Sequence, residues 1–152
     1  MAKFVFRVQA ALDLRRKQED EAKRALALAE AQRRDAERCR DEVQQEMERT
    51  CARGREVEDR AGDVTLSVWY RNWLTAQRLE LERRQRVLVQ RDADVRGAVK
   101  QAQEAYRKRR MLERLRERSQ TAFLDGERRD EQKVFDDLGS LRFSVNRRGG
   151  LS

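Results

Sequence analysis

Residues 58–67, EDRAGDVTLS, separate two long segments that share a seven-residue apolar repeat. Gly62 in this stretch, and Gly54 just before it, weaken helix continuation because glycine loses more conformational freedom on folding than other residues do. Three residues can cap a following helix by accepting a backbone N–H: Asp63, Thr65 and Ser67. The stretch therefore predicts the end of one helix, a turn at about 61–66 and the start of a second helix.

The segment before the turn carries one row of residues at seven-residue spacing: Val8, Arg15, Ala22, Ala29, Ala36, Val43, Thr50 and Val57. Leu12, Leu26 and Met47 lie four residues after members of this row and widen the stripe. A seven-residue apolar repeat is typical of a coiled-coil helix. We expect a helix over about 4–60.

The segment after the turn has a second row, formed by Leu74, Leu81, Leu88, Val95 and Ala102 and continued on the adjoining row by Ala98, Ala105 and Leu112. It predicts a helix over about 67–138, and Gly139 with RRGG at 147–150 predicts a flexible tail over 139–152. A short connection between two helices favours antiparallel packing. The predicted fold class is all-α: one domain, 1–152, forming a long antiparallel two-helix coiled coil, or α-helical hairpin.

The composition argues against an ordinary globular enzyme. Charged residues make up 42% of the chain and aromatic residues only 6%, which is too little apolar volume for a compact core. The chain has no histidine, no GxxxxGK and no GxSxG, so the common nucleophilic, metal and phosphate-binding patterns are missing. We therefore expect no catalytic residue, no metal and no cofactor.

The apolar runs are short, and the start MAKFVFRVQ lacks the apolar region of a signal peptide, so a cytosolic protein is expected. Cys39 and Cys51 form no CxxC pair, and we expect both to be reduced thiols.

The basic stretch YRKRRMLERLRER at 106–118 and the net charge of +8 raise nucleic acid as a partner. However, Glu104, Glu113 and Glu117 interrupt the basic charge, and the stretch does not precede a zipper as in basic-zipper proteins. We therefore expect no nucleic-acid partner, and an acidic protein surface is the better complement.

Three stretches of the chain resemble the FliJ family, the coiled-coil component of the flagellar type III export apparatus. They are FVFRVQAALDLRRKQEDEAKRALA at the start, YRNWL early in the second helix and ERRDEQKVFDDL near the end. The resemblance implies a non-enzymatic central stalk whose terminal ends enter the hexameric export ATPase. It also implies that the stalk couples the ATPase to the membrane export gate and contacts export chaperones.

The resemblance implies two sets of site residues. ATPase-ring binding is expected at Phe4, Phe6, Arg7, Arg15, Arg128 and Lys133. We also expect apolar residues near the two ends to meet: Phe4, Phe6, Leu12 and Leu14 with Phe123, Leu124, Phe135 and Leu138. Closing the end of the coiled coil would explain these apolar residues equally well. A place in the cytoplasm, peripheral to the bacterial inner membrane through partners only, follows from the same resemblance.

Export-gate binding is expected at Trp69, Tyr70, Trp73 and Leu74, in the stretch VWYRNWL. Trp69 and Trp73 are four residues apart and share a helix face, so not all of these rings can be buried between two helices. An exposed aromatic patch is a candidate docking surface. The alternative is that the rings pack the tip of the hairpin over Val57 and Val64. Gln77 departs from the apolar residue typical of the family at this point, which puts gate contacts beyond Leu74 in doubt.

Two other functions remain open. The stalk protein of a virulence injectisome would share the fold and the mechanism, and only neighbouring genes would distinguish it. A generic structural coiled coil would instead dimerise through its apolar rows as a parallel two-chain rod.

Overall fold

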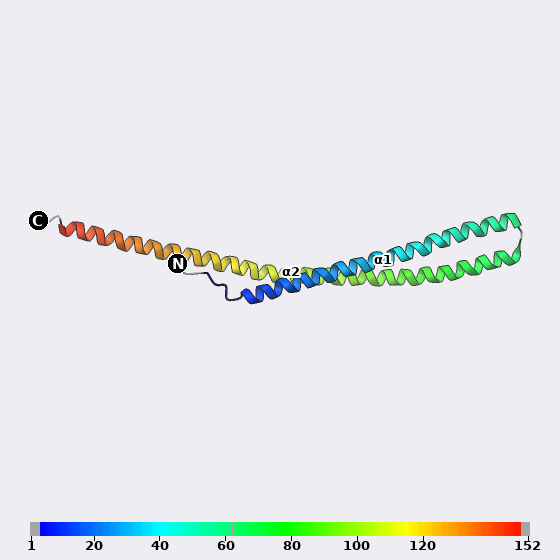
Figure 1. Cartoon of the computed structure of the whole chain (residues 1–152), viewed down its shortest axis with the longest axis horizontal. Helices are drawn as coiled ribbons and strands as arrows, with labels where there is room; N and C mark the ends of the chain where they lie inside the picture. Colours follow the sequence, from blue (N-terminus) through cyan, green and yellow to red (C-terminus); the bar gives the residue numbers. More distant parts are fainter. Residues whose placement is uncertain (1–3, 62, 150–152) are drawn as a thin grey trace. The chain divides into compact units, whose positions relative to one another are not determined.

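Two long α-helices make up the structure. A computed structural model describes residues 4–61 and 63–149, with α1 at Gln9–Ala61 and α2 at Val64–Gly149 (Figure 1). The described residues contain no strand, and the two helices pack against each other. The prediction of an all-α helical hairpin is confirmed.

The chain divides into two compact units. Among the described residues, unit 1 joins the segment up to Lys17 to the segment from Tyr106 onward, and unit 2 lies between Gln18 and Ala105. Unit 1 therefore contains the segments nearest both ends of the chain, and unit 2 contains the turn.

The helices are antiparallel within unit 2. Near the turn, the ring of Tyr70 packs beside Gly54, and further along Arg33 Nε donates a 2.6 Å hydrogen bond to Asp92. From the first contact to the second, the residue number on α1 decreases while the residue number on α2 increases, as in an antiparallel pair. Figure 1 shows the cyan part of α1 beside the green part of α2. This hydrogen bond also holds the pKa of Arg33 above its ordinary value.

Asp63 starts α2. Its Oδ1 accepts hydrogen bonds from the backbone N–H groups of Thr65 (2.9 Å) and Leu66 (3.3 Å), and its carbonyl accepts one from the Ser67 N–H. These bonds satisfy amides at the start of the helix that have no partner within it. Of the three capping residues predicted from the sequence, Asp63 caps the helix.

The helix bounds differ from the predicted ones in three places. α1 begins at Gln9 rather than near Phe4, because the aromatic and β-branched residues of FVFRV have low helix propensity. α2 begins at Val64, inside the predicted turn, because Asp63 caps it. α2 also continues to Gly149, through most of the predicted tail, since a lone glycine costs a helix only about 1 kcal/mol and no proline follows. Gly62 of the predicted turn and residues 150–152 of the predicted tail lie outside the described residues.

The buried seam is narrow and partly polar. Leu12 and Leu88 are the only buried apolar residues among those described, while four buried residues are polar or charged: Glu19, Thr50, Ser67 and Gln77. Two helices alone cannot enclose a wide core, so most seam residues are half-buried. The exposed surface carries both charged side chains and large apolar ones.

Candidate functional site

The tryptophans of VWYRNWL form an exposed stack in unit 2. The rings of Trp69 and Trp73 are 5.9 Å apart with an interplanar angle of 3°, and they remain 54% and 45% exposed. The four-residue spacing puts both rings on one side of α2. Val64, over which the rings were also candidates to pack, is itself largely exposed, so the stack does not cover it.

Tyr70 and Leu74 lie on the side of α2 that faces α1, and both are half-buried. A Cβ at position 54 would lie 3.6 Å from the Tyr70 ring, in ordinary van der Waals contact, so the ring packs beside the backbone of α1 at Gly54. The Tyr70 ring also meets the Trp69 ring edge-on, with centroids 5.0 Å apart. The four candidate gate residues thus divide into an exposed pair, Trp69 and Trp73, and a seam pair, Tyr70 and Leu74.

Gln77 occupies the seam one helical turn beyond Leu74. It is only 8% exposed, and its Oε1 has no hydrogen-bond partner among the described residues. A buried amide oxygen without a partner loses its hydration and gains nothing in return. Gln77 therefore lowers the stability of the helix pair and is not part of the exposed surface around the tryptophans.

The six candidate ring-binding residues all belong to unit 1. Phe4, Phe6 and Arg15 are half-buried, whereas Arg7 is exposed. Arg128 and Lys133 are exposed on α2, with carboxylates at 3.9 Å (Asp125) and 3.2 Å (Asp130) respectively. The unit therefore collects residues from both ends of the sequence, although the chain separates them by more than a hundred positions.

Only part of the predicted apolar contact between the two ends forms. The rings of Phe4 and Phe123 lie 5.7 Å apart at a tilt of 53°, and Leu12 is fully buried. Four other residues of the predicted set are exposed instead: Leu14, Leu124, Phe135 and Leu138. Phe135 and Leu138 lie beyond the part of α2 that Phe4 reaches, which explains why they do not meet the N-terminal residues.

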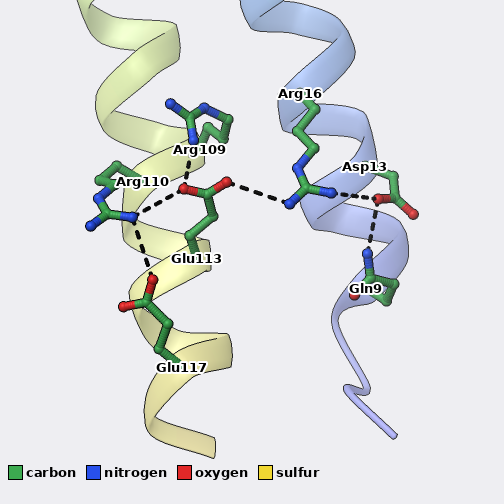
Figure 2. Close-up of polar contacts among 7 residues, drawn as sticks. All are labelled: Gln9, Asp13, Arg16, Arg109, Arg110, Glu113 and Glu117. Carbon is green, nitrogen blue, oxygen red and sulfur yellow. Dashed lines mark hydrogen bonds and ion pairs between the residues drawn. The ribbon is translucent and has the colours of Figure 1, made fainter. Parts of the chain in front are cut away.

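A charged network joins α1 to α2 in unit 1 (Figure 2). Glu113 accepts hydrogen bonds from Arg109 (2.5 Å), Arg110 (3.3 Å) and, across the helix pair, Arg16 (3.5 Å). Arg110 also contacts Glu117 at 3.4 Å. The hydrogen bond from Arg109, with help from Arg110 and Arg16, holds the pKa of Glu113 below its usual value even though partial burial opposes this.

The C-terminal part of α2 carries an exposed apolar stripe that includes Phe135 and Leu138, two residues expected to meet the N-terminal segment. Every described side chain from residue 128 to residue 145 is exposed. Four apolar residues recur there at helical spacing, namely Val134, Leu138, Leu141 and Val145, and Phe135 lies beside them. The seven-residue rows named above end at Leu112, and the sequence signal for this stripe is a separate apolar repeat of three and four residues from Val134 to Val145.

The described residues hold no cluster of three or more His, Cys, Asp or Glu side chains that could bind a metal ion. Cys39 and Cys51 are half-buried and form no disulfide. In the described part of the chain, no helix has a segment long and apolar enough to cross a membrane.

A family model described as flagellar FliJ protein matches residues 4–148, which is nearly the whole chain. The chain belongs to the FliJ family. Comparison with curated proteins and with solved structures gave no match. FliJ proteins are structural components of flagellar export and are not known as enzymes. The match includes both the tryptophan stack and the C-terminal stripe, so both features belong to the part of the chain that aligns with the FliJ family.

Proposed function

We propose that this FliJ-family chain is the non-enzymatic central stalk of the flagellar type III export apparatus. Its terminal segments enter the hexameric export ATPase, its tryptophan region binds the cytoplasmic part of the membrane export gate, and it also contacts export chaperones. The protein then acts in the cytoplasm, at the inner membrane only through these partners. Flagellum assembly, and with it motility and chemotaxis, depends on it.

The stripe of Val134, Phe135, Leu138, Leu141 and Val145 is the observation that carries the proposal. Five large apolar side chains on one fully exposed helical segment favour burial against a partner surface. Arg128 and Lys133 on the same segment supply charge beside the stripe. All six candidate ring residues share unit 1 with the stripe, as insertion of the terminal segments into one ring requires.

The tryptophan stack supports a separate gate contact. Trp69 and Trp73 expose large flat rings, and aromatic side chains frequently supply much of the energy of an interface. They belong to unit 2, whereas the candidate ring residues belong to unit 1. The two binding functions can therefore be removed separately.

Two double variants test the proposal. Trp69→Ala with Trp73→Ala should weaken binding to the gate's cytoplasmic domain by about tenfold or more and leave stimulation of the ATPase intact. Leu138→Ser with Leu141→Ser should reduce stimulation of the ATPase and leave gate binding intact. The fold should persist, since both leucines are exposed and support no internal packing. Pull-down with each purified partner and the ATP hydrolysis rate provide the measurements. Loss of ATPase stimulation in the tryptophan variant, with gate binding unchanged, would reverse the assignment of the two regions.

The stalk of a virulence injectisome would share the hairpin and the two binding regions, and it remains the alternative function. Genes adjacent to this one decide between the two systems: flagellar genes support the proposal, and genes for a needle complex support the alternative. A generic dimeric rod would have to pair its apolar rows with a second chain. Within unit 2 those rows already face each other, as the contact between Gly54 and Tyr70 illustrates.

A further inference from the structure

A strongly basic face lies on α2 in unit 1, over residues 106–118. The stretch contains seven arginines and lysines and only two glutamates, Glu113 and Glu117. In the sequence these carboxylates interrupt the basic charge. Whether they neutralise it depends on which arginines they contact.

Both carboxylates bond to the same small group of arginines. Glu113 accepts hydrogen bonds from Arg16, Arg109 and Arg110, and its side chain is only 18% exposed (Figure 2). Glu117 contacts Arg110. Arg107, Arg114 and Arg118 therefore keep their charge uncompensated, because no ion pair joins any of them to another residue of the described chain.

The uncompensated arginines border an exposed apolar strip. Met111 is 66% exposed and Leu115 is 45% exposed. These two residues line a groove of about 680 Å³ together with four arginines: Arg107, Arg110, Arg114 and Arg118. The name arginine face is used below for these six residues.

The apolar strip continues toward the N-terminal segment within unit 1. Leu115 also lines a second groove, of about 330 Å³, with Val5, Phe6 and Val8. Val5 and Val8 are exposed. The two grooves share a lining residue, so an elongated ligand could follow the strip from Met111 past Leu115 to the valines.

We propose that the arginine face binds an acidic amphipathic helix of a partner protein. Glutamates or aspartates on that helix pair with Arg107, Arg114 and Arg118, whose guanidinium groups present paired donors to carboxylates. An apolar row on the same helix packs on Met111 and Leu115, and the flexible thioether of methionine adapts to varied side chains. This is helix-in-groove recognition with charge complementarity along its edge.

The apolar strip distinguishes this ligand from nucleic acid. Phosphate groups would pair with the arginines but offer nothing apolar to cover Met111, which is 66% exposed. An anionic membrane would need a wide apolar face to insert, whereas arginines border this strip along its length. A helix with carboxylates beside an apolar row satisfies both kinds of residue.

The proposal is independent of the ring-binding role. None of the six candidate ring residues belongs to the arginine face, and the stripe at 134–145 lies outside it. Phe6 and Arg7 line only the second groove, which the substitutions used in the test leave unchanged. Failure of one proposal would therefore leave the other in place.

A synthetic helical peptide with glutamates flanking a row of leucines serves as the probe, and its binding to the full chain is measured by fluorescence polarisation. The triple variant Arg107→Ala, Arg114→Ala, Arg118→Ala should bind about tenfold more weakly. Three exposed arginines of unit 2 provide a matched control: Arg24→Ala, Arg78→Ala, Arg96→Ala should stay within about twofold of the wild type. Circular dichroism checks that both variants keep their helices.

Met111→Ser tests the apolar part of the face. This substitution should weaken peptide binding several-fold. The slope of affinity against salt concentration should stay unchanged, because no charge is lost. Equal losses in the control triple variant, or equal binding of a peptide with lysines in place of the glutamates, would overturn the proposal. So would tighter binding of a single-stranded oligonucleotide, or of vesicles containing phosphatidylglycerol, that is insensitive to Met111→Ser. Such a result would make the face a phosphate-binding surface.

Discussion

At the scale of single residues, a buried polar group without a hydrogen-bond partner lowers the stability of the hairpin. Gln77 shows this most clearly, because its Oε1 is buried without a hydrogen-bond partner in the described structure. Gln77→Leu should raise the free energy of unfolding by about 1–2 kcal/mol, since leucine removes the desolvation cost and buries apolar area. Thermal or urea unfolding followed by circular dichroism measures the change.

Gln101→Leu is the matched control for Gln77→Leu, because Gln101 is exposed on the same helix in the same unit. It should change the free energy of unfolding by no more than about 0.5 kcal/mol. A lower stability for Gln77→Leu would contradict this account and would indicate that a water molecule or partner satisfies the amide.

Glu113 makes the helix contact in unit 1 dependent on pH. Its pKa is lowered in the folded chain, chiefly by the hydrogen bond from Arg109. The stabilisation is therefore complete above the ordinary glutamate pKa of about 4.3 and is lost as the pH falls through the lowered folded value. Glu113→Gln should lower stability at pH 7 by roughly 0.5–1 kcal/mol, and the difference from the wild type should shrink below about pH 4.

Glu117→Gln is the control for Glu113→Gln, because it removes a carboxylate from the same helix without removing the contact to Arg16. The Glu117 side chain is 63% exposed, and among the described residues its carboxylate forms an ion pair only with Arg110. We expect Glu117→Gln to leave the free energy of unfolding at pH 7 close to that of the wild type, because its ion pair is exposed. If Glu113→Gln and Glu117→Gln gave the same stability curve against pH, the convergence of three arginines on Glu113 would have no measurable effect.

At the scale of one element, α2 tolerates glycines that serve no visible packing role. A Cβ added at Gly97 would meet nothing within 4 Å, and the residue is in the helix interior. Gly97→Ala should therefore raise the free energy of unfolding by about 0.5–1 kcal/mol, because alanine loses less backbone entropy in a helix. The melting temperature from circular dichroism measures the effect.

Ala93→Gly is the reverse substitution on an exposed site of the same helix. It should lower stability by a similar amount. If Gly97→Ala instead destabilised the chain, α2 would need the glycine for a local bend.

At the scale of the whole molecule, the chain folds back on itself, and a disulfide can report this in solution. Moving back along α1 from Gly54 and forward along α2 from Tyr70 by equal numbers of residues leads to Ala22 and Ala102, both half-buried in unit 2. Ala22→Cys with Ala102→Cys, in a chain with Cys39→Ala and Cys51→Ala, should oxidise to an intramolecular disulfide. Non-reducing gel electrophoresis distinguishes the monomer from linked chains.

Either cysteine alone, in the same background, should yield no intramolecular product. If the double variant formed only linked pairs of chains, the parallel rod would replace the hairpin as the state in solution.

The sequence alone predicts the two helices and their antiparallel arrangement. Seven-residue rows such as Leu74, Leu81 and Leu88 arise from local periodicity, and a capping residue after a glycine indicates a turn without any tertiary information. The same local signals were less reliable at the helix ends. The start of α1 at Gln9 and the continuation of α2 to Gly149 depend on small differences in the helix propensities of several residues. No single residue such as proline ends either helix.

Tertiary structure alone decided which polar and aromatic side chains are available to partners. By sequence Trp69 and Tyr70 are adjacent, yet one ring is exposed and the other lies beside Gly54. By sequence Glu113 interrupts a basic run, yet its bonds to Arg16, Arg109 and Arg110 leave other arginines uncompensated. Periodicity is a property of the backbone and can be read along one chain. Arg109 and Arg110 reach Glu113 within α2, but the bond from Arg16 and the exposure of each ring depend on which groups the second helix brings near. These features exist only once the two helices have packed.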